Sequence, residues 1–252
     1  MTDNATNTPI WTDLASPDVE GSKAFYGGLF GWEAETVAPP EYGSYTMFKL
    51  GGKQVGAVAT MQEGQHPAWS IYIGTEDADA TVEKVLDAGG EIALKPEDVT
   101  EDGRIAIVRD ATGAFLSLWQ PKAHTGFDTK DVPGSFGWAE LATRDIEGAK
   151  KFYAAVFGWG AETSGEGPAA YTEWKLGGKS IAGAMEMGPE RPAQIPAHWL
   201  VYFAVADVGA STPKAGELGA SVVVPAMDFP GGRFAVARDP LGAVFGLMRL
   251  NP

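Results

Sequence analysis

One segment of the chain occurs twice in closely related form. Residues 11–32 (WTDLASPDVEGSKAFYGGLFGW) align without a gap to residues 138–159 (WAELATRDIEGAKKFYAAVFGW), with identity at 12 of 22 positions. Two further pairs follow in the same order: YTMFKLGGK with YTEWKLGGK, and GRIAIVRDATGAF with GRFAVARDPLGAV. A repeat of this extent predicts two structural modules of about 125 residues joined head to tail.

The two modules are expected at residues 1–122 and 135–252, with a linker at 123–134. The sequence around this linker, PKAHTGFDTKDVPG, is polar and contains Pro and Gly, which is typical of a connection between domains. A chain of 252 residues is long enough for two domains of ordinary size.

Hydrophobic periodicity predicts the same order of elements twice within a module. The first unit comprises a strand at 10–15, a helix capped by Asp18 and ended by Gly31, and strands near 32–37, 44–50 and 53–61. The second comprises a strand at 69–74, a helix at 77–88, and strands near 91–95, 104–109 and 114–120. Each unit is therefore βαβββ, and the chain is expected to be an α+β protein with four such units.

The repeated aromatic residues recur at helical spacing. We expect them to pack the first helix against its own sheet, since aromatics in this pattern are usually core residues; they are Phe25, Tyr26, Phe30 and Trp32. The pair Gly27-Gly28 is replaced by Ala154-Ala155 in the second copy. A phosphate-binding glycine loop is therefore not expected here.

Composition restricts the possible partners. The net charge of −14, from 19 basic and 33 acidic residues, disfavours nucleic acid and anionic membranes. The chain contains no cysteine, which excludes disulfides and thiolate chemistry. No apolar run is long enough to span a bilayer. We expect a cytoplasmic monomer or homodimer whose partner is a small molecule.

The order βαβββ-βαβββ, with an Asp-capped helix that carries FY and is followed by FGW, resembles the vicinal oxygen chelate superfamily. That superfamily includes glyoxalase I, bleomycin-resistance proteins and extradiol dioxygenases. The chain is similar in particular to two-module actinobacterial proteins described as glyoxalase-like or "hydroxylase". The resemblance implies tandem modules, each with two units forming a half-open barrel sheet around a small-molecule site, and a role in secondary metabolism.

The resemblance also implies where a metal would be bound. Metal-containing members use His, Gln or Glu side chains that point into the barrel from the first, fourth, fifth and eighth strands. The first-strand position holds Trp11 in the first module and Trp138 in the second. The fifth-strand position holds Ser70 and Leu200, and the eighth-strand position holds Ser117 and Gly246. The fourth strand offers only Gln54 or Glu186. Because indole, leucine and glycine supply no side-chain ligand, we expect neither a metal nor another cofactor.

Strand alternation predicts which side chains line the two cavities. The residues expected to contact a small hydrophobic or aromatic ligand are Trp11, Ser70, Tyr72, Phe115, Ser117, Trp119, Trp138, His198, Tyr202 and Met248. Each cavity also contains one acid, Asp13 or Glu140, and we expect these to act as catalytic bases because burial raises the pKa of an acid. The alternative is that each acid only accepts hydrogen bonds from the backbone or from Arg104 or Arg233. His198 lies at the rim or donates a proton.

Three functions remain open at the level of sequence. The first is metal-independent proton transfer, hydration or cyclisation on an aromatic, polyketide-like or quinone-like substrate. The second is sequestration of a drug or toxin between aromatic rings. The third is a glyoxalase-type lyase reaction on a dicarbonyl adduct, which the missing metal ligands oppose. The first pocket is the more polar of the two, so one ligand per chain is expected.

Overall fold

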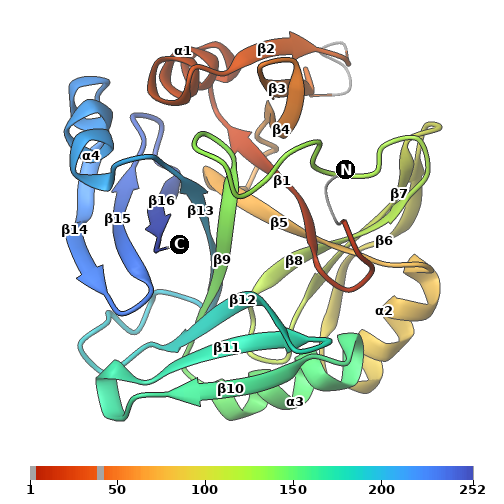
Figure 1. Cartoon of the computed structure of the whole chain (residues 1–252). Coiled ribbons are helices and arrows are strands. Elements are labelled where there is room, and N and C mark those ends of the chain that lie inside the picture. Colours follow the sequence, from red (N-terminus) through yellow and green to blue (C-terminus); the bar gives the residue numbers. More distant parts are fainter. Residues whose placement is uncertain (1–3, 39–42, 252) are drawn as a thin grey trace.

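A computed structural model of the chain describes residues 4–38 and 43–251, in which each module forms one eight-stranded sheet with two long helices (Figure 1). The first sheet has the strand order β2-β3-β4-β1-β5-β8-β7-β6, and the second has the equivalent order β10-β11-β12-β9-β13-β16-β15-β14. Neither order closes on itself. The predicted α+β fold of tandem modules, each with two βαβββ units in a half-open sheet, is confirmed.

The elements follow the predicted ranges closely. Those of the first module are β1 (Pro9–Ser16), α1 (Val19–Phe30), β2 (Glu33–Thr36), β3 (Thr46–Leu50), β4 (Lys53–Thr60), β5 (Ala68–Gly74), α2 (Ala78–Asp87), β6 (Glu91–Val99), β7 (Gly103–Arg109) and β8 (Phe115–Pro121). Those of the second are β9 (Phe136–Thr143), α3 (Ile146–Phe157), β10 (Gly160–Ser164), η2 (Gly167–Ala169), β11 (Tyr171–Leu176), β12 (Lys179–Glu186), β13 (His198–Ala204), α4 (Val208–Glu217), β14 (Ser221–Phe229), β15 (Gly232–Arg238) and β16 (Val244–Leu250).

The helix ends are determined by local chemistry. The Asp18 carboxylate accepts a hydrogen bond from the Gly21 backbone N–H at 3.0 Å, which caps α1. Gly31 ends this helix in the left-handed conformation, with φ of 75°. Asp145 and Gly158 perform the same two roles in α3, so the repeat preserves both signals.

The register of the central strands positions the two predicted acids. β1 runs parallel to β4 and antiparallel to β5, and Asp13 pairs with Ala57 on one side and Ser70 on the other. In the second sheet, Glu140 on β9 occupies the equivalent position between β12 and β13. Both acids therefore lie in the middle of a sheet, with a strand on either side.

The repeated aromatic segment packs between the modules as well as within one. The rings of Tyr26 and Phe245 lie 5.6 Å apart, and those of Phe30 and Phe203 lie 5.2 Å apart. The Tyr26 hydroxyl donates to the Asp239 carboxylate at 2.9 Å in the second module. The expectation that these aromatics pack the first helix on its own sheet was therefore incomplete, because they also contact Phe203 and Phe245 of the other module.

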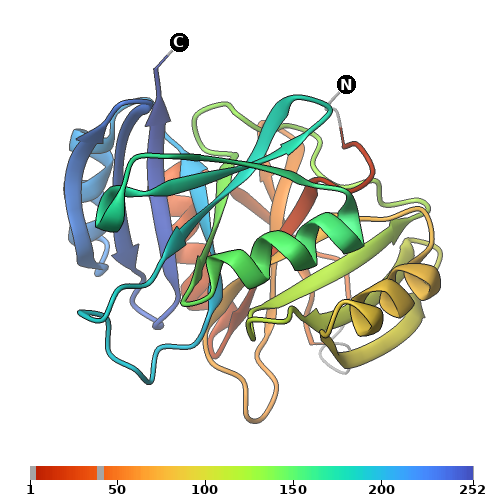
Figure 2. The same ribbon diagram turned by 90° about the horizontal axis from the view of Figure 1, so that it is seen from below.

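The second copy of the segment makes the reciprocal contact. The Tyr153 hydroxyl donates to Asp110 of the first module at 2.7 Å, and it accepts a hydrogen bond from the Trp199 indole at 3.0 Å. α3 lies beside α2 in both views, and α1 lies beside α4 in Figure 1 (Figures 1 and 2). The repeat thus encodes a pseudo-symmetric interface as well as two similar modules.

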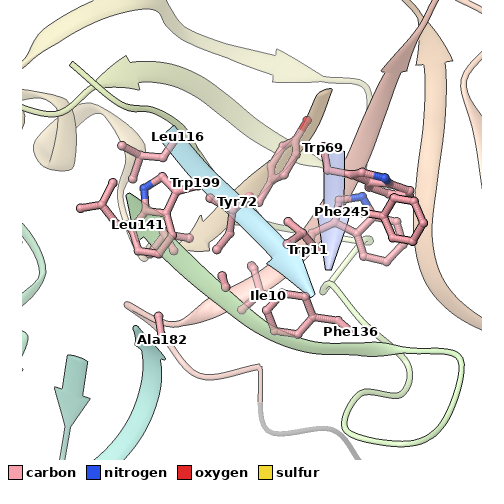
Figure 3. Close-up of a cluster of buried hydrophobic side chains, with 14 of the residues drawn as sticks. Ile10, Trp11, Trp69, Tyr72, Leu116, Phe136, Leu141, Ala182, Trp199 and Phe245 are labelled. Carbon is pink, nitrogen blue, oxygen red and sulfur yellow. The ribbon is translucent and has the colours of Figure 1, made fainter. Parts of the chain in front are cut away.

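Both modules contribute to one continuous hydrophobic core. Figure 3 shows side chains of the two halves together; its labels include Ile10, Trp69 and Leu116 from the first module and Phe136, Trp199 and Phe245 from the second. Because this core crosses the boundary between modules, the two halves are expected to unfold as a unit.

The connection between the sheets is packed against the protein. Its Phe127 is 1% exposed and stacks on Phe136 at 4.9 Å, and the Phe127 N–H donates to the carbonyl of Ile10 at 2.8 Å. The Trp32 indole donates to the Gly134 carbonyl at 2.6 Å. Among the described residues, no helix has the length and apolar character that a bilayer crossing requires.

Candidate functional site

Asp13 is the centre of a hydrogen-bonded group in the first module. Its Oδ2 atom accepts from the Tyr72 hydroxyl at 2.6 Å and from the Tyr45 hydroxyl at 3.3 Å. The Trp11 indole N–H in turn donates to the Tyr45 oxygen at 3.1 Å. Ser70 on the neighbouring strand also hydrogen-bonds with the acid. Trp11, Asp13, Ser70 and Tyr72 lie on one face of the first sheet, because Trp11 pairs with Tyr72 and Asp13 pairs with Ser70.

Burial among these side chains raises the pKa of Asp13 to about 6, although the hydrogen bonds from Tyr72, Tyr45 and Ser70 act in the opposite direction. Desolvation outweighs them because these donors are neutral and none carries a compensating positive charge. The acid in turn holds the pKa values of both tyrosines well above 10, after the larger effect of burial. Asp13 can therefore exchange a proton near neutral pH while its partners remain protonated.

Glu140 is the centre of the same arrangement in the second module. The Tyr202 hydroxyl donates to Glu140 Oε1 at 3.2 Å, and Tyr171 also hydrogen-bonds with this carboxyl group. The Trp138 indole donates to the Tyr171 oxygen at 2.9 Å. Burial raises the pKa of Glu140, while the two phenols and the more distant charge of Arg191 lower it in part.

Two glycines accommodate the longer acid of the second module. Gly183 is the cross-strand partner of Glu140, and a Cβ atom there would overlap the Tyr171 hydroxyl. A Cβ atom at Gly246 would overlap the Tyr202 ring. The first module has Ala57 and Ser117 at these positions, opposite a shorter acid. The exchange of Asp for Glu is therefore accompanied by loss of side-chain volume around it.

The connecting segment covers the first site. The ring of His124 meets Trp11 edge-on at 4.4 Å between centroids and lies 5.8 Å from Trp119, whose indole donates to the His124 carbonyl at 2.9 Å. Phe127 lies 5.4 Å from Trp11 on the same side. As a result Trp11 is 2% exposed.

The second site is more open. Trp138, the counterpart of Trp11, is only half-buried, and within residues 4–38 and 43–251 no aromatic ring stacks on it. An apolar cluster surrounds this part of the second sheet; its members are Trp138, Leu200, Tyr202, Val224, Phe229, Phe234, Val236, Val244 and Met248. A cleft of about 480 Å³ reaches Trp138 from the β11–β12 turn, although Glu140 itself does not line it.

Most of the predicted site residues come together. The structure groups Trp11, Ser70, Tyr72, Ser117 and Trp119 near Asp13, and Trp138, Tyr202 and Met248 near Glu140. Phe115 lies apart, 57% exposed under the guanidinium of Arg109 at 5.3 Å. His198 occupies the first position of β13, with Nδ1 2.9 Å from the Pro196 carbonyl.

The proposed arginine partners were wrong. Arg104 pairs with Asp79 and Asp98, and Arg233 pairs with Asp228, all on the protein surface. Tyrosine hydroxyls occupy the positions that these arginines were expected to take.

Sequence reasoning missed Tyr45 and Tyr171. Both begin the repeated segments YTMFKLGGK and YTEWKLGGK, so conservation of a tyrosine between the two copies was the available signal. Neither was selected because the alternation was applied to the first, fifth and eighth strands of each module, whereas Tyr45 directly precedes the third strand and Tyr171 begins it. His124 was missed because it was assigned to the linker.

The family model of the glyoxalase/bleomycin resistance protein/dioxygenase superfamily matches residues 9–118 and 135–247. The chain belongs to this superfamily. The resemblance seen in the sequence is thereby confirmed. The two matched ranges correspond to the two sheets of the structure, so each module matches the family.

The chain aligns over its whole length with a relative of known name. It is 39% identical over 266 residues to "Anthracycline biosynthesis protein DnrV" of Streptomyces peucetius, an alignment that spans 100% of this chain and 96% of the relative. Among solved structures, the Mn(II)-bound glyoxalase from Novosphingobium aromaticivorans has a TM-score of 0.66 at 15% identity, covering 96% of this chain and 82% of that one.

A second structural neighbour is 2,2',3-trihydroxybiphenyl 1,2-dioxygenase from Sphingomonas wittichii. Its TM-score is 0.68 at 12% identity, and the match covers 97% of this chain and 90% of the dioxygenase. At such low identity, the two solved structures show that the superfamily fold is shared and do not indicate a common reaction.

A metal ion of the kind bound by some superfamily members does not fit the residues present here. The expected ligand positions hold tryptophan, serine, leucine and glycine, as described above, and Trp11 and Trp138 use their N–H groups as donors to tyrosine. Glu186 lies three residues beyond Gly183 on β12 and so faces away from Glu140. Over the described ranges, no three His, Cys, Asp or Glu side chains are grouped so that they could hold a metal.

Proposed function

We propose that the second module binds a planar, largely apolar aromatic molecule and that Glu140 exchanges a proton with it. The observation that carries this proposal is a partly buried carboxyl group that hydrogen-bonds to phenols in an apolar, half-open sheet. A carboxyl group in such surroundings loses hydration, a cost that stacking of a ligand alone would not require.

The surroundings of Glu140 suit a flat ligand. Trp138 and Phe234 offer aromatic surfaces, and Leu200 and Met248 offer aliphatic ones. A cleft of about 480 Å³ adjoins this surface at Trp138. The first module is the weaker candidate because His124 and its neighbours cover that site.

The chemistry of Glu140 follows from its partners. In the ionised form, the carboxylate can remove a proton from an acidic C–H or O–H group of the ligand, and the resulting carboxylic acid can return it to another atom. The net reaction is an isomerisation that needs no redox partner. The same proton transfer can also assist hydration or cyclisation of the ligand. Tyr171 and Tyr202 orient the carboxyl group and stabilise its charge by hydrogen bonding.

The relatives support a polyketide-like ligand. DnrV is described as an anthracycline biosynthesis protein, and anthracyclines contain a planar fused-ring system. We propose that this protein acts on a molecule of that type in secondary metabolism, in the cytoplasm. The lyase alternative requires metal ligands that the residues do not provide, and it is not proposed.

Anthrone, a fused tricyclic ketone with an acidic CH₂ group, provides a direct test. Under nitrogen in D₂O, the wild-type protein should accelerate deuterium incorporation at this carbon, followed by mass spectrometry. Glu140→Gln should reduce the rate by roughly a hundredfold while anthrone still quenches tryptophan fluorescence, because an amide keeps the shape but accepts no proton. Asp13→Asn is the matched control and should retain the exchange.

Two outcomes would contradict the proposal. If the wild-type protein binds anthrone without accelerating exchange, the protein sequesters its ligand and has no proton-transfer activity on it. If Asp13→Asn abolishes exchange while Glu140→Gln does not, the working site is in the first module.

A further inference from the structure

The second module contains a loop that the first module lacks in this form. Residues 187–197 separate β12 from β13, whereas residues 61–67 separate β4 from β5, so the loop is four residues longer in the second module. It leads directly into His198, which is two positions before Leu200 and therefore on the same face of β13. The loop thus lies at one end of the proposed binding surface.

A single arginine holds this loop in place. The Arg144 guanidinium donates to the backbone carbonyl of Pro192 at 2.8 Å, to those of Gly188 and Arg191 at 3.4 Å each, and to that of Met187 at 3.5 Å. Bonding from one planar group to several carbonyls restricts the loop without using any of its side chains.

Arg144 has no counterpart in the first module, where the aligned residue is Pro17. The loop and the residue that holds it therefore occur together, in the module whose site is open.

Arg191 is the cation that this loop presents. Its side chain is exposed, and in the part of the chain that the structure describes no carboxylate forms an ion pair with it. Its positive charge nevertheless acts on both Glu140 and Tyr202, lowering the pKa of each against the larger effect of burial. Arg191 is therefore close enough to influence Glu140 and Tyr202 electrostatically.

His198 adds a polar group at the same end. Since Nδ1 lies 2.9 Å from the Pro196 carbonyl, which can only accept, this nitrogen carries the proton. In the neutral ring, Nε2 is then an acceptor. The opposite end of the surface, at Trp138, is aromatic and adjoins the cleft, which Lys130 and Lys179 also line. Both lysines already have interaction partners, whereas Arg191 forms no ion pair within the described residues, so Arg191 is the cation available to a ligand.

We propose that the ligand of the second module is an aromatic carboxylic acid, whose carboxylate pairs with Arg191 while its rings lie toward Trp138. This inference rests on the proposed function and adds the chemical class of the ligand. The protein carries a net charge of −14 and repels anions at long range. A preference for an acid must therefore come from a local cation, and Arg191 is placed to provide it.

The test compares two probes of the same shape, anthraquinone-2-carboxylate and anthraquinone-2-carboxamide, by titration with tryptophan fluorescence. The wild-type protein should bind the carboxylate about tenfold more tightly, as expected for a charge-assisted hydrogen bond. Arg191→Gln should remove this preference and leave carboxamide binding unchanged, and Arg191→Lys should retain part of it. Lys150→Gln, which removes a surface charge on α3, controls for net charge and should behave as wild type.

The outcomes separate this inference from the function on which it rests. Equal binding of the two probes by the wild-type protein, or a preference that survives in Arg191→Gln, would overturn the role of Arg191 and leave the aromatic site in place. Failure of the protein to bind either probe would overturn the aromatic site itself, and the inference with it.

Discussion

Replacement of Asp13 by asparagine should make the protein more stable at neutral pH. The amide has the shape of the carboxyl group and can still accept hydrogen bonds from Tyr72 and Tyr45. It carries no charge, so it avoids the desolvation that raises the pKa of Asp13 from 3.8 to about 6.

The magnitude follows from the difference between the two pKa values. A rise from 3.8 to about 6 corresponds to about 3 kcal/mol, since each pKa unit is 1.36 kcal/mol. In the native state Asp13 keeps its proton to higher pH than in the unfolded chain. This group therefore lowers the free energy of unfolding as the pH rises from 3.8 to about 6. The stabilisation in Asp13→Asn should approach about 3 kcal/mol at pH 8 and be about 1.4 kcal/mol smaller at pH 5.

Urea denaturation followed by tryptophan fluorescence at pH 5 and pH 8 measures this effect. Tyr45 and Tyr72, which face the acid, do not titrate in this range because their pKa values lie well above 10. Glu20→Gln removes one exposed acid from α1 and should show no comparable dependence on pH. An advantage of Asp13→Asn that is the same at both pH values would refute the reasoning.

Two further predictions concern the module interface and metal content. Tyr26→Phe should lower the free energy of unfolding by about 3 kcal/mol, because it leaves the Asp239 Oδ2 atom and the Trp69 indole N–H buried without a partner, while Asp239 Oδ1 keeps its backbone donors. Tyr153→Phe should match it, and a loss below about 1 kcal/mol for either variant in urea titrations would argue against the reciprocal interface. Elemental analysis of the desalted protein should find no stoichiometric zinc, nickel, manganese or iron, and one equivalent per module would contradict the reading of the ligand positions.

The sequence by itself determined the modular organisation and the course of the chain within each module. These features depend on short-range signals, such as the capping carboxylate of Asp18, the left-handed Gly31 and the alternation of side chains along strands. The same alternation was enough to place Asp13 on one face with Trp11, and Glu140 on one face with Trp138. Signals of this kind act over a few residues, and for that reason they survive in an isolated sequence.

Only the tertiary structure decided which residues complete each site and which site is open. Tyr26 meets Asp239 across 213 positions of the chain, and Tyr45 reaches Asp13 across 32. The segment with His124 covers one tryptophan and leaves its counterpart Trp138 half-buried. Such contacts depend on how two sheets and a connecting segment pack together, and no local pattern in the sequence records that packing, because the partners become neighbours only when the shared core forms.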